Sequence, residues 1–190
     1  MKNRPLVGLF GRAARGNMRL ALGLSLHTGW AACVVAGGSL SDPRIEARQE
    51  LELLGDKDRF VFHRAAELAR ADAKRSIERA WSMALERASA AIRQLKHDKD
   101  VRICAVVAKH GEMPPLDTVL ASHPRIHTAE GIFYRDAVME AARANGLVAR
   151  VVPPSTLDAN DRTLTAAGQI VGKPWNRDFK LAALAAWRSL

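Results

Sequence analysis

Two short apolar segments near the start of the chain are separated by a polar turn. Residues 20–26 and 29–36 are apolar at nearly every position, and the turn between them contains His27, Thr28 and Gly29. A glycine-containing turn between two such segments predicts a β-hairpin. Because polar and apolar positions do not alternate within either segment, we expect both strands to be central in a sheet and covered on both faces.

A third segment alternates between apolar and charged positions. In residues 44–53, one face would carry Ile45, Ala47, Gln49, Leu51 and Leu53, and the charged residues would lie on the other face. This period of two predicts a half-exposed strand. We place it at an edge of the sheet, where its charges discourage pairing with another chain.

The rest of the chain alternates between helical and strand patterns. Apolar positions recur every three or four residues from about residue 64 to 96, which predicts one long helix. The sequence VRICAVVA at residues 101–108 predicts a buried strand, which should run parallel to an earlier strand because a helix precedes it. The same patterns predict a helix over residues 128–144, a strand over 147–152 and helices over 164–171 and 178–190.

We expect these elements to form an α/β fold with a five-stranded mixed sheet. Three antiparallel strands followed by alternating helices and strands, with the sheet order 3-2-1-4-5 and helices flanking the sheet, is the ribonuclease H-like arrangement. The hairpin sequence LALGLSLHTGWAACVV resembles the opening of RuvC-type Holliday junction resolvases. The residues that match the pattern of that family in place are Gly23, Thr28, Gly29 and Trp30. The sequence DFKLAALAAW at residues 178–187 is also similar to the alanine-rich last helix of that family.

The length of 190 residues fits one folded domain. We expect this domain to span residues 19–190, after a flexible basic tail at residues 1–18 that contains glycines, a proline and no periodic pattern. Cys33 and Cys104 both lie in apolar runs, so we expect two reduced core residues. No segment predicts a secretory signal or a membrane span, and we expect a cytoplasmic protein without a membrane partner.

The net charge of +9 suggests nucleic acid as a partner, but the charge is unevenly distributed. Five basic residues and no acid occur within residues 1–19, which leaves a net charge of +4 for the remaining chain. Among these five, Arg12, Arg15 and Arg19 are our candidates for contacts with nucleic-acid phosphates.

The resemblance to resolvases implies a catalytic site from which this sequence departs. Nucleases of this fold hold two magnesium ions with carboxylates from the first strand, the fourth strand and the last helix. Ser25 stands at the first of these positions, whereas Lys109, His110 and then Glu112 follow the fourth strand, and Asp178 is the acid of the last helix. A hydroxyl does not replace an anionic ligand of a hard cation. We therefore expect no two-metal cleavage, and magnesium only if the protein is a divergent nuclease.

We expect a cleft where the first and fourth strands end. Strand alternation places the side chains of Ser25 and His27 on one side of the first strand. The candidate residues of the cleft are Ser25, His27, Thr28, Lys109, His110, Glu112, His127, Glu130 and Asp178.

Four histidines, at positions 27, 110, 123 and 127, would border this cleft, which could bind a phosphate-bearing ligand or a transition metal. His123 and His127 are one helical turn apart, but Pro124 favours a loop there, so we assign no metal ligand from the spacing. In the alternative interpretation, these histidines are loop caps and surface groups without a ligand.

The sequence thus supports two functions from different classes. In the first, the protein is a non-catalytic ribonuclease H-like module that binds nucleic acid or another partner. In the second, it is a divergent nuclease or a phosphate-handling hydrolase that uses the histidine-lined cleft at the ends of the first and fourth strands.

Overall fold

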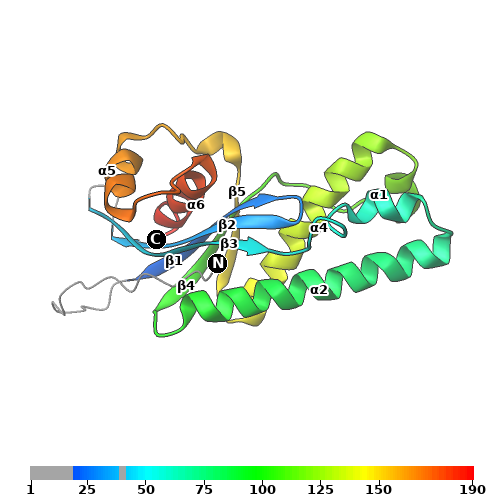
Figure 1. The fold of residues 1–190 in the computed structure, drawn as a ribbon, viewed down its shortest axis with the longest axis horizontal. Coiled ribbons are helices and arrows are strands. Elements are labelled where there is room, and N and C mark those ends of the chain that lie inside the picture. Colours follow the sequence, from blue (N-terminus) through cyan, green and yellow to red (C-terminus); the bar gives the residue numbers. More distant parts are fainter. Residues whose placement is uncertain (1–18, 39–41) are drawn as a thin grey trace.

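The computed structural model describes residues 19–38 and 42–190, which form a five-stranded mixed sheet with helices on both faces (Figure 1). The strands are β1 (Leu20–His27), β2 (Trp30–Gly38), β3 (Pro43–Glu52), β4 (Val101–Val107) and β5 (Val148–Val152). They lie in the order β3-β2-β1-β4-β5, as predicted. β1, β2 and β3 pair antiparallel, and β4 is parallel to both β1 and β5.

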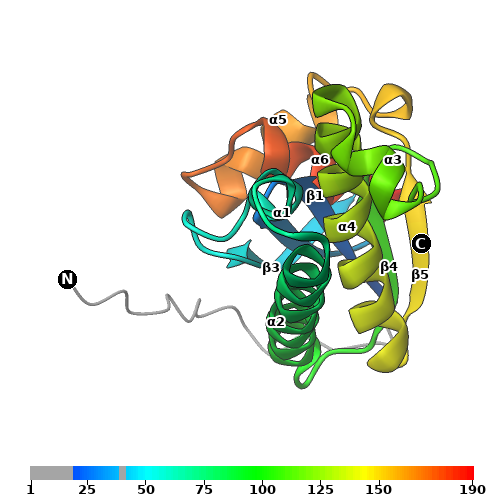
Figure 2. The ribbon, with the colours of Figure 1, turned by 90° about the vertical axis from the view of Figure 1, so that its right-hand side faces the viewer.

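Two groups of helices cover the two faces of the sheet. The helices are α1 (Val61–Ala66), α2 (Arg70–Lys96), α3 (Leu116–Leu120), α4 (His123–Ala144), α5 (Arg162–Val171) and α6 (Arg177–Trp187), with a short 3-10 helix at Pro154–Thr156. Side chains of α1, α2 and α4 share one hydrophobic core with the sheet, and side chains of α5 and α6 fill a second core on the opposite face. Figure 2 shows α2 and α4 lying side by side on the first face.

The central strand β1 is buried on both faces, as its uniform apolar pattern predicts. Leu22 and Leu24 point into the core beneath α2 and α4, whereas Ala21 points into the core beneath α5 and α6. Its neighbours β2 and β4 pair with it along almost its whole length. No helix among the described residues combines the length and the apolarity that crossing a bilayer requires.

The backbone of α6 lies directly against β1 at Gly23. A Cβ atom built on Gly23 would lie 1.8 Å from the carbonyl oxygen of Ala182, which is too close for two non-bonded atoms. Small side chains on the buried face of α6, among them Ala183 and Ala186, permit this approach. At the other end of the helix, the indole Nε1 of Trp187 donates a hydrogen bond to the carbonyl oxygen of Gly37 at 2.9 Å. Glycine at position 23 and the alanines of α6 therefore fix the height of the helix above the sheet.

The edge strand β3 departs from the predicted strict alternation. Its register with β2 shifts by one residue between the pairs Val35–Ala47 and Ala36–Ile45, which is a β-bulge. As a result, Ala47 packs against the core beneath α2, whereas Ile45 packs against the core beneath α5 and α6. The prediction that both residues share one face is wrong, because the bulge turns part of the strand over.

The predicted long helix over residues 64–96 is two helices. α1 ends at Ala66 and α2 begins at Arg70, and Ala69 between them is extended (φ −58, ψ 148). Neither proline nor glycine marks this break. The break lets α1 pack against α4 while it buries Val61 and Phe62, so tertiary packing overrides the local helical pattern.

The helix predicted over residues 128–144 begins earlier than expected. α4 starts at His123, and Pro124 lies in its first turn. Proline is tolerated there because the first amides of a helix have no intrahelical acceptor. The loop that we expected around Pro124 is therefore wrong, and His123 and His127 lie on the same helix.

Both cysteines are free and fully buried, as predicted. Burial raises the pKa of Cys104 to about 12. Burial and the neighbouring Cys104 raise the pKa of Cys33 even further. Both thiols are therefore protonated at neutral pH and behave as small core side chains.

Replacing Gly23 with alanine should destabilise the protein strongly. The new Cβ would overlap the backbone of Ala182, so α6 or β1 must move. We expect the free energy of unfolding to fall by about 3 kcal/mol or more in chemical denaturation.

The matched control for this substitution is Gly131→Ala. Gly131 lies within α4, and a Cβ built on it meets no atom within 4 Å. Alanine should therefore stabilise this helix by about 0.5–1 kcal/mol. Equal and small effects of the two substitutions would contradict the close approach of α6 to β1.

Candidate functional site

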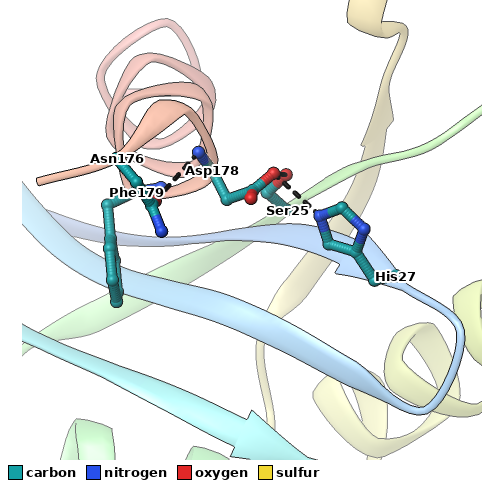
Figure 3. Close-up of polar contacts among 5 residues, drawn as sticks. All are labelled: Ser25, His27, Asn176, Asp178 and Phe179. Atoms are coloured by element: carbon teal, nitrogen blue, oxygen red, sulfur yellow. Dashed lines mark hydrogen bonds and ion pairs between the residues drawn. The ribbon is translucent and has the colours of Figure 1, made fainter. Parts of the chain in front are cut away.

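The candidate site lies where β1 and β4 end and α6 begins. The two strands are parallel and in register up to the pair Ser25–Val107, so their carboxyl ends meet at the same edge of the sheet. The first turn of α6 lies above this edge and contributes Asp178 (Figure 3). Three segments that are far apart in the sequence therefore meet here.

Ser25 and His27 both contact the carboxylate of Asp178. The hydroxyl of Ser25 donates a hydrogen bond to Asp178 Oδ1 at 3.2 Å, and His27 Nε2 lies 2.8 Å from the same oxygen (Figure 3). The two side chains thus lie on one side of β1, as the strand period predicts. The His27 ring also stacks on Trp30, with a centroid distance of 4.4 Å and an angle of 4° between the planes. The side chains of His27 and Asp178 remain 42% and 23% exposed.

Asn176 fixes the position of Asp178 at the start of α6. Its side-chain oxygen accepts hydrogen bonds from the amides of Asp178 and Phe179, each at 3.1 Å, which is the geometry of a helix N-cap. The acid in the first turn is further favoured by the helix dipole. Beneath this turn, Phe179 is buried, and the guanidinium of Arg48 lies 5.7 Å from the centre of its ring.

Arg48 ties the segment before α6 to the edge strand β3. Its Nη2 atom donates hydrogen bonds to the carbonyl oxygens of Val171 and Lys173, at 3.2 and 2.8 Å. Burial lowers the pKa of this arginine from its ordinary value, although it remains charged at neutral pH. Arg48 therefore holds the segment that leads into α6, on the N-terminal side of Asp178.

The donor atoms at this edge do not fit a pair of magnesium ions. Magnesium prefers several oxygen ligands, of which carboxylates supply the charge. In the described part of the chain, the Asp178 carboxylate is bonded to a hydroxyl and an imidazole, and Asp178 does not belong to any group of three His, Cys, Asp or Glu side chains close enough to share a metal ion. The chemistry available here is that of a single carboxylate that orients a histidine.

The loop after β4 carries three further candidates, Lys109, His110 and Glu112. Arg135 from α4 holds its backbone, because Nη1 donates to the carbonyl oxygen of Lys109 at 3.0 Å and Nη2 donates to that of Gly111 at 2.8 Å. The side chains of the three candidates are exposed. His110 lines a shallow hollow together with Arg135, and Asp178 is not among the residues that line this hollow.

Thr28 lies at the tip of the β1–β2 hairpin, between His27 and Gly29. The adjacent Gly29 has a φ of 87°, and its carbonyl oxygen accepts hydrogen bonds from the amides of Leu53 and Leu54. A Cβ at Gly29 would lie 2.5 Å from the Cβ of Arg59. The Thr-Gly pair therefore closes the hairpin against the loop after β3, and Thr28 borders a hollow on that side.

His127 and Glu130 lie on α4, where they meet His63 and His123. α4 covers the face of the sheet opposite α6, so this group is separate from the Ser25–Asp178 contact. The structure does not bring the candidate histidines into the single cleft that we expected. His63 was missed, because it lies 60 residues from His123 in the sequence. The spacing His-x₃-His-x₂-Glu from position 123 was the available signal.

The candidate phosphate contacts lie elsewhere. Arg12 and Arg15 are outside the described residues. Arg19 is exposed and immediately precedes β1, at the opposite end of that strand from Ser25.

The sheet order and the flanking helices are those of the ribonuclease H-like fold. No protein-family model matches the sequence, and no curated protein gives a significant match. Among solved structures, the chain is similar to RuvC of T. thermophilus in complex with a Holliday junction substrate. The TM-score is 0.55 and the sequence identity is 11%, and the match covers 89% of this chain and 90% of that chain. A likeness at this identity establishes the fold alone.

Introducing a second acid with Ser25→Asp should make the stability of the protein depend on a divalent cation. Ser25 is buried and its Oγ lies 3.2 Å from Asp178 Oδ1, so two carboxylates would repel each other at this distance. At neutral pH without divalent cations, we expect the free energy of unfolding to fall by about 3 kcal/mol relative to Ser25→Asn. Thermal denaturation should show that excess Mg²⁺ restores much of this loss.

Ser25→Asn is the control because it matches the volume of aspartate without its charge. Neither this variant nor the wild-type protein should be stabilised by Mg²⁺. Equal stabilisation of the wild-type protein by Mg²⁺ would contradict the conclusion that its donor atoms do not fit this ion.

Proposed function

We propose that this protein is a ribonuclease H-like module that binds nucleic acid without cleaving it. In this proposal, the acidic site of resolvase-type proteins has degenerated. The observation that carries it is the state of Asp178, whose carboxylate is bonded to both Ser25 and His27. The position that would supply a second acid from β1 supplies a hydroxyl instead.

The residues after β4 support the absence of two-metal chemistry. Lys109 and His110 follow the strand where an acid would be needed, and Glu112 lies further along an exposed loop. A lysine at this edge would repel a bound cation. The same lysine is suited to a phosphate group, because its exposed ammonium can approach the nucleic-acid backbone.

Three observations support nucleic acid as the partner. The net charge of the chain is +9. Lys109, His110 and Arg177 expose cationic or ionisable side chains near the edge formed by the ends of β1 and β4 and the start of α6. The structural neighbour RuvC was solved in complex with a Holliday junction substrate, which identifies nucleic acid as a ligand of at least one protein with this fold.

In this proposal, the basic residues near the start of the chain add a non-specific contribution. Arg12, Arg15 and Arg19 would contact phosphates and strengthen binding at low salt, since such contacts release counterions. The sequence specificity, or the preference for a branched structure, would then reside in the remaining residues.

The second candidate function is hydrolysis of a phosphate ester with His27 as the general base. The observation in its favour is the 2.8 Å contact between His27 Nε2 and Asp178, because a carboxylate commonly orients a catalytic imidazole in this way. The other ring nitrogen would accept the proton of an attacking water molecule. Ser25 would then be a positioning residue that holds the same carboxylate oxygen.

Binding and cleavage assays on one panel of substrates separate these functions. The panel contains branched, duplex and single-stranded DNA and RNA, each with Mg²⁺, with Mn²⁺ and with EDTA. We expect binding to at least one substrate, unchanged by EDTA, and no cleavage under any condition. If the protein cleaves a substrate and Asp178→Asn or His27→Ala abolishes this cleavage, the proposal of a non-catalytic module is wrong and the second candidate function is supported. Absence of binding to the entire panel would refute the nucleic-acid-binding module and would also exclude nucleic acid as the substrate of the second candidate function.

The binding measurement also tests substitutions of two lysines at opposite ends of β4. Lys109 follows the strand and Lys99 precedes it. Lys109→Gln should weaken binding and reduce the slope of log K against log salt by about 1, whereas Lys99→Gln should leave both unchanged. Equal effects would show that binding does not depend on this edge.

A further inference from the structure

Three histidines outside the proposed nucleic-acid site converge on one point. His63 comes from α1, and His123 and His127 come from the first two turns of α4. Each offers one ring nitrogen such that the three nitrogens lie within 4.8 Å of one another. We propose that this group, here called the three-histidine cluster, binds a divalent transition-metal ion such as zinc.

The spacing of the ring nitrogens is close to that of a metal site. His63 Nε2 and His123 Nε2 lie 3.2 Å apart. Two nitrogen ligands of tetrahedral zinc, each about 2.0–2.1 Å from the ion, are separated by about 3.3 Å. His127 completes the group, with ring centroids 4.7 Å from His63 and 4.6 Å from His123. Small rotations of the exposed rings of His123 and His127 would complete the coordination.

Secondary structure brings these residues together. Because α4 begins at His123, His123 and His127 are one turn apart and face the same way. α1 packs against α4 and presents His63 from its last turn. A bound ion would therefore join two helices through His63 and His123, which are 60 positions apart in the sequence.

Glu130 orients His63 for this role. Its Oε1 atom lies 2.8 Å from Nδ1 of His63 and accepts the hydrogen bond when that nitrogen carries the proton. In this tautomer, Nε2 of the neutral ring has a free lone pair that points into the cluster. A carboxylate that accepts from the second nitrogen of a histidine ligand is a common feature of zinc sites.

The burial of Glu130 independently points to a cation. Its side chain is only 1% exposed, and within the described part of the chain its Oε2 atom is buried without a hydrogen-bond partner. A buried carboxylate with half of its acceptor capacity unused is costly. A divalent ion on His63 would place positive charge on the far side of the ring and offset this cost.

The ligand type selects the class of metal. Imidazole nitrogens suit zinc and the neighbouring transition metals, whereas magnesium and calcium prefer oxygen ligands. Three histidines leave a fourth position for water or an exogenous oxygen ligand. The metal-free alternative is a hydrogen bond between His123 Nε2 and His63 Nε2, which the 3.2 Å distance also permits.

Zinc titration of the 190-residue protein, stripped of metal with a chelator, tests this proposal. We expect isothermal titration calorimetry to show one zinc ion per chain. His123→Ala and His127→Ala should weaken binding at least about 100-fold. His97→Ala is the matched control, because His97 is an exposed histidine at the end of α2. This substitution should leave zinc affinity unchanged.

Co²⁺ absorption and circular dichroism check that the loss of zinc binding reflects missing ligands. Co²⁺ should give the absorption of a tetrahedral nitrogen-ligated ion in the wild-type protein and in His97→Ala, but not in His123→Ala. Circular dichroism should show that the metal-free variants retain the wild-type fold. No zinc binding by the wild-type protein, or equal binding by wild type and His123→Ala, would overturn the proposal.

Glu130→Gln tests the positioning role of the carboxylate. Glutamine keeps the shape but removes the charge, so zinc affinity should fall by about 10–100-fold. The metal-free variant should be at least as stable as the metal-free wild type, because a buried charge is removed. A merely structural role would lower stability and leave zinc affinity unchanged, which would contradict the assignment of Glu130.

Discussion

The direct contact between the α6 backbone and β1 at Gly23 is the constraint on which the rest of the structure depends. It requires a glycine on the strand, alanines on the helix and a central position for β1, and each requirement is met. A helix held this close to the sheet places its first turn over the end of the strand it covers. Asp178 therefore lies above Ser25 and His27 because of how α6 packs, and not because of any local feature of those residues.

The chemistry of this edge follows from the residues that the packing brings together. One carboxylate, one hydroxyl and one imidazole satisfy one another and provide no pair of anionic groups for two hard cations. Exposed basic side chains follow β4 and begin α6, and in the proposed function they would contact phosphate groups. The three-histidine cluster belongs to the opposite face of the sheet, so a metal there would be independent of nucleic-acid contact at this edge.

Much of the fold could be predicted because the apolar pattern is strong where burial is complete. The uninterrupted apolar residues of β1 and β2 predicted central strands, and the order of helices and strands along the chain predicted the strand order of the sheet. The predictions failed where tertiary packing decided the outcome: the bulge that separates Ile45 from Ala47, and the break before Arg70. The site was harder to predict. Ser25, His27 and Asp178 were identified as candidates, but their shared contact depends on packing, and His63 joins its partners only through the docking of α1 on α4.

In the proposed function, the edge formed by β1, β4 and α6 holds no divalent cation, because Asp178 is engaged by Ser25 and His27. Crystals of the protein soaked in Mn²⁺ and measured by anomalous diffraction test this claim directly. The account predicts no anomalous peak within coordination distance of Asp178 and an intact contact between Asp178 and His27. A peak bound to Asp178, with Ser25 and His27 turned away or serving as further ligands, would contradict it.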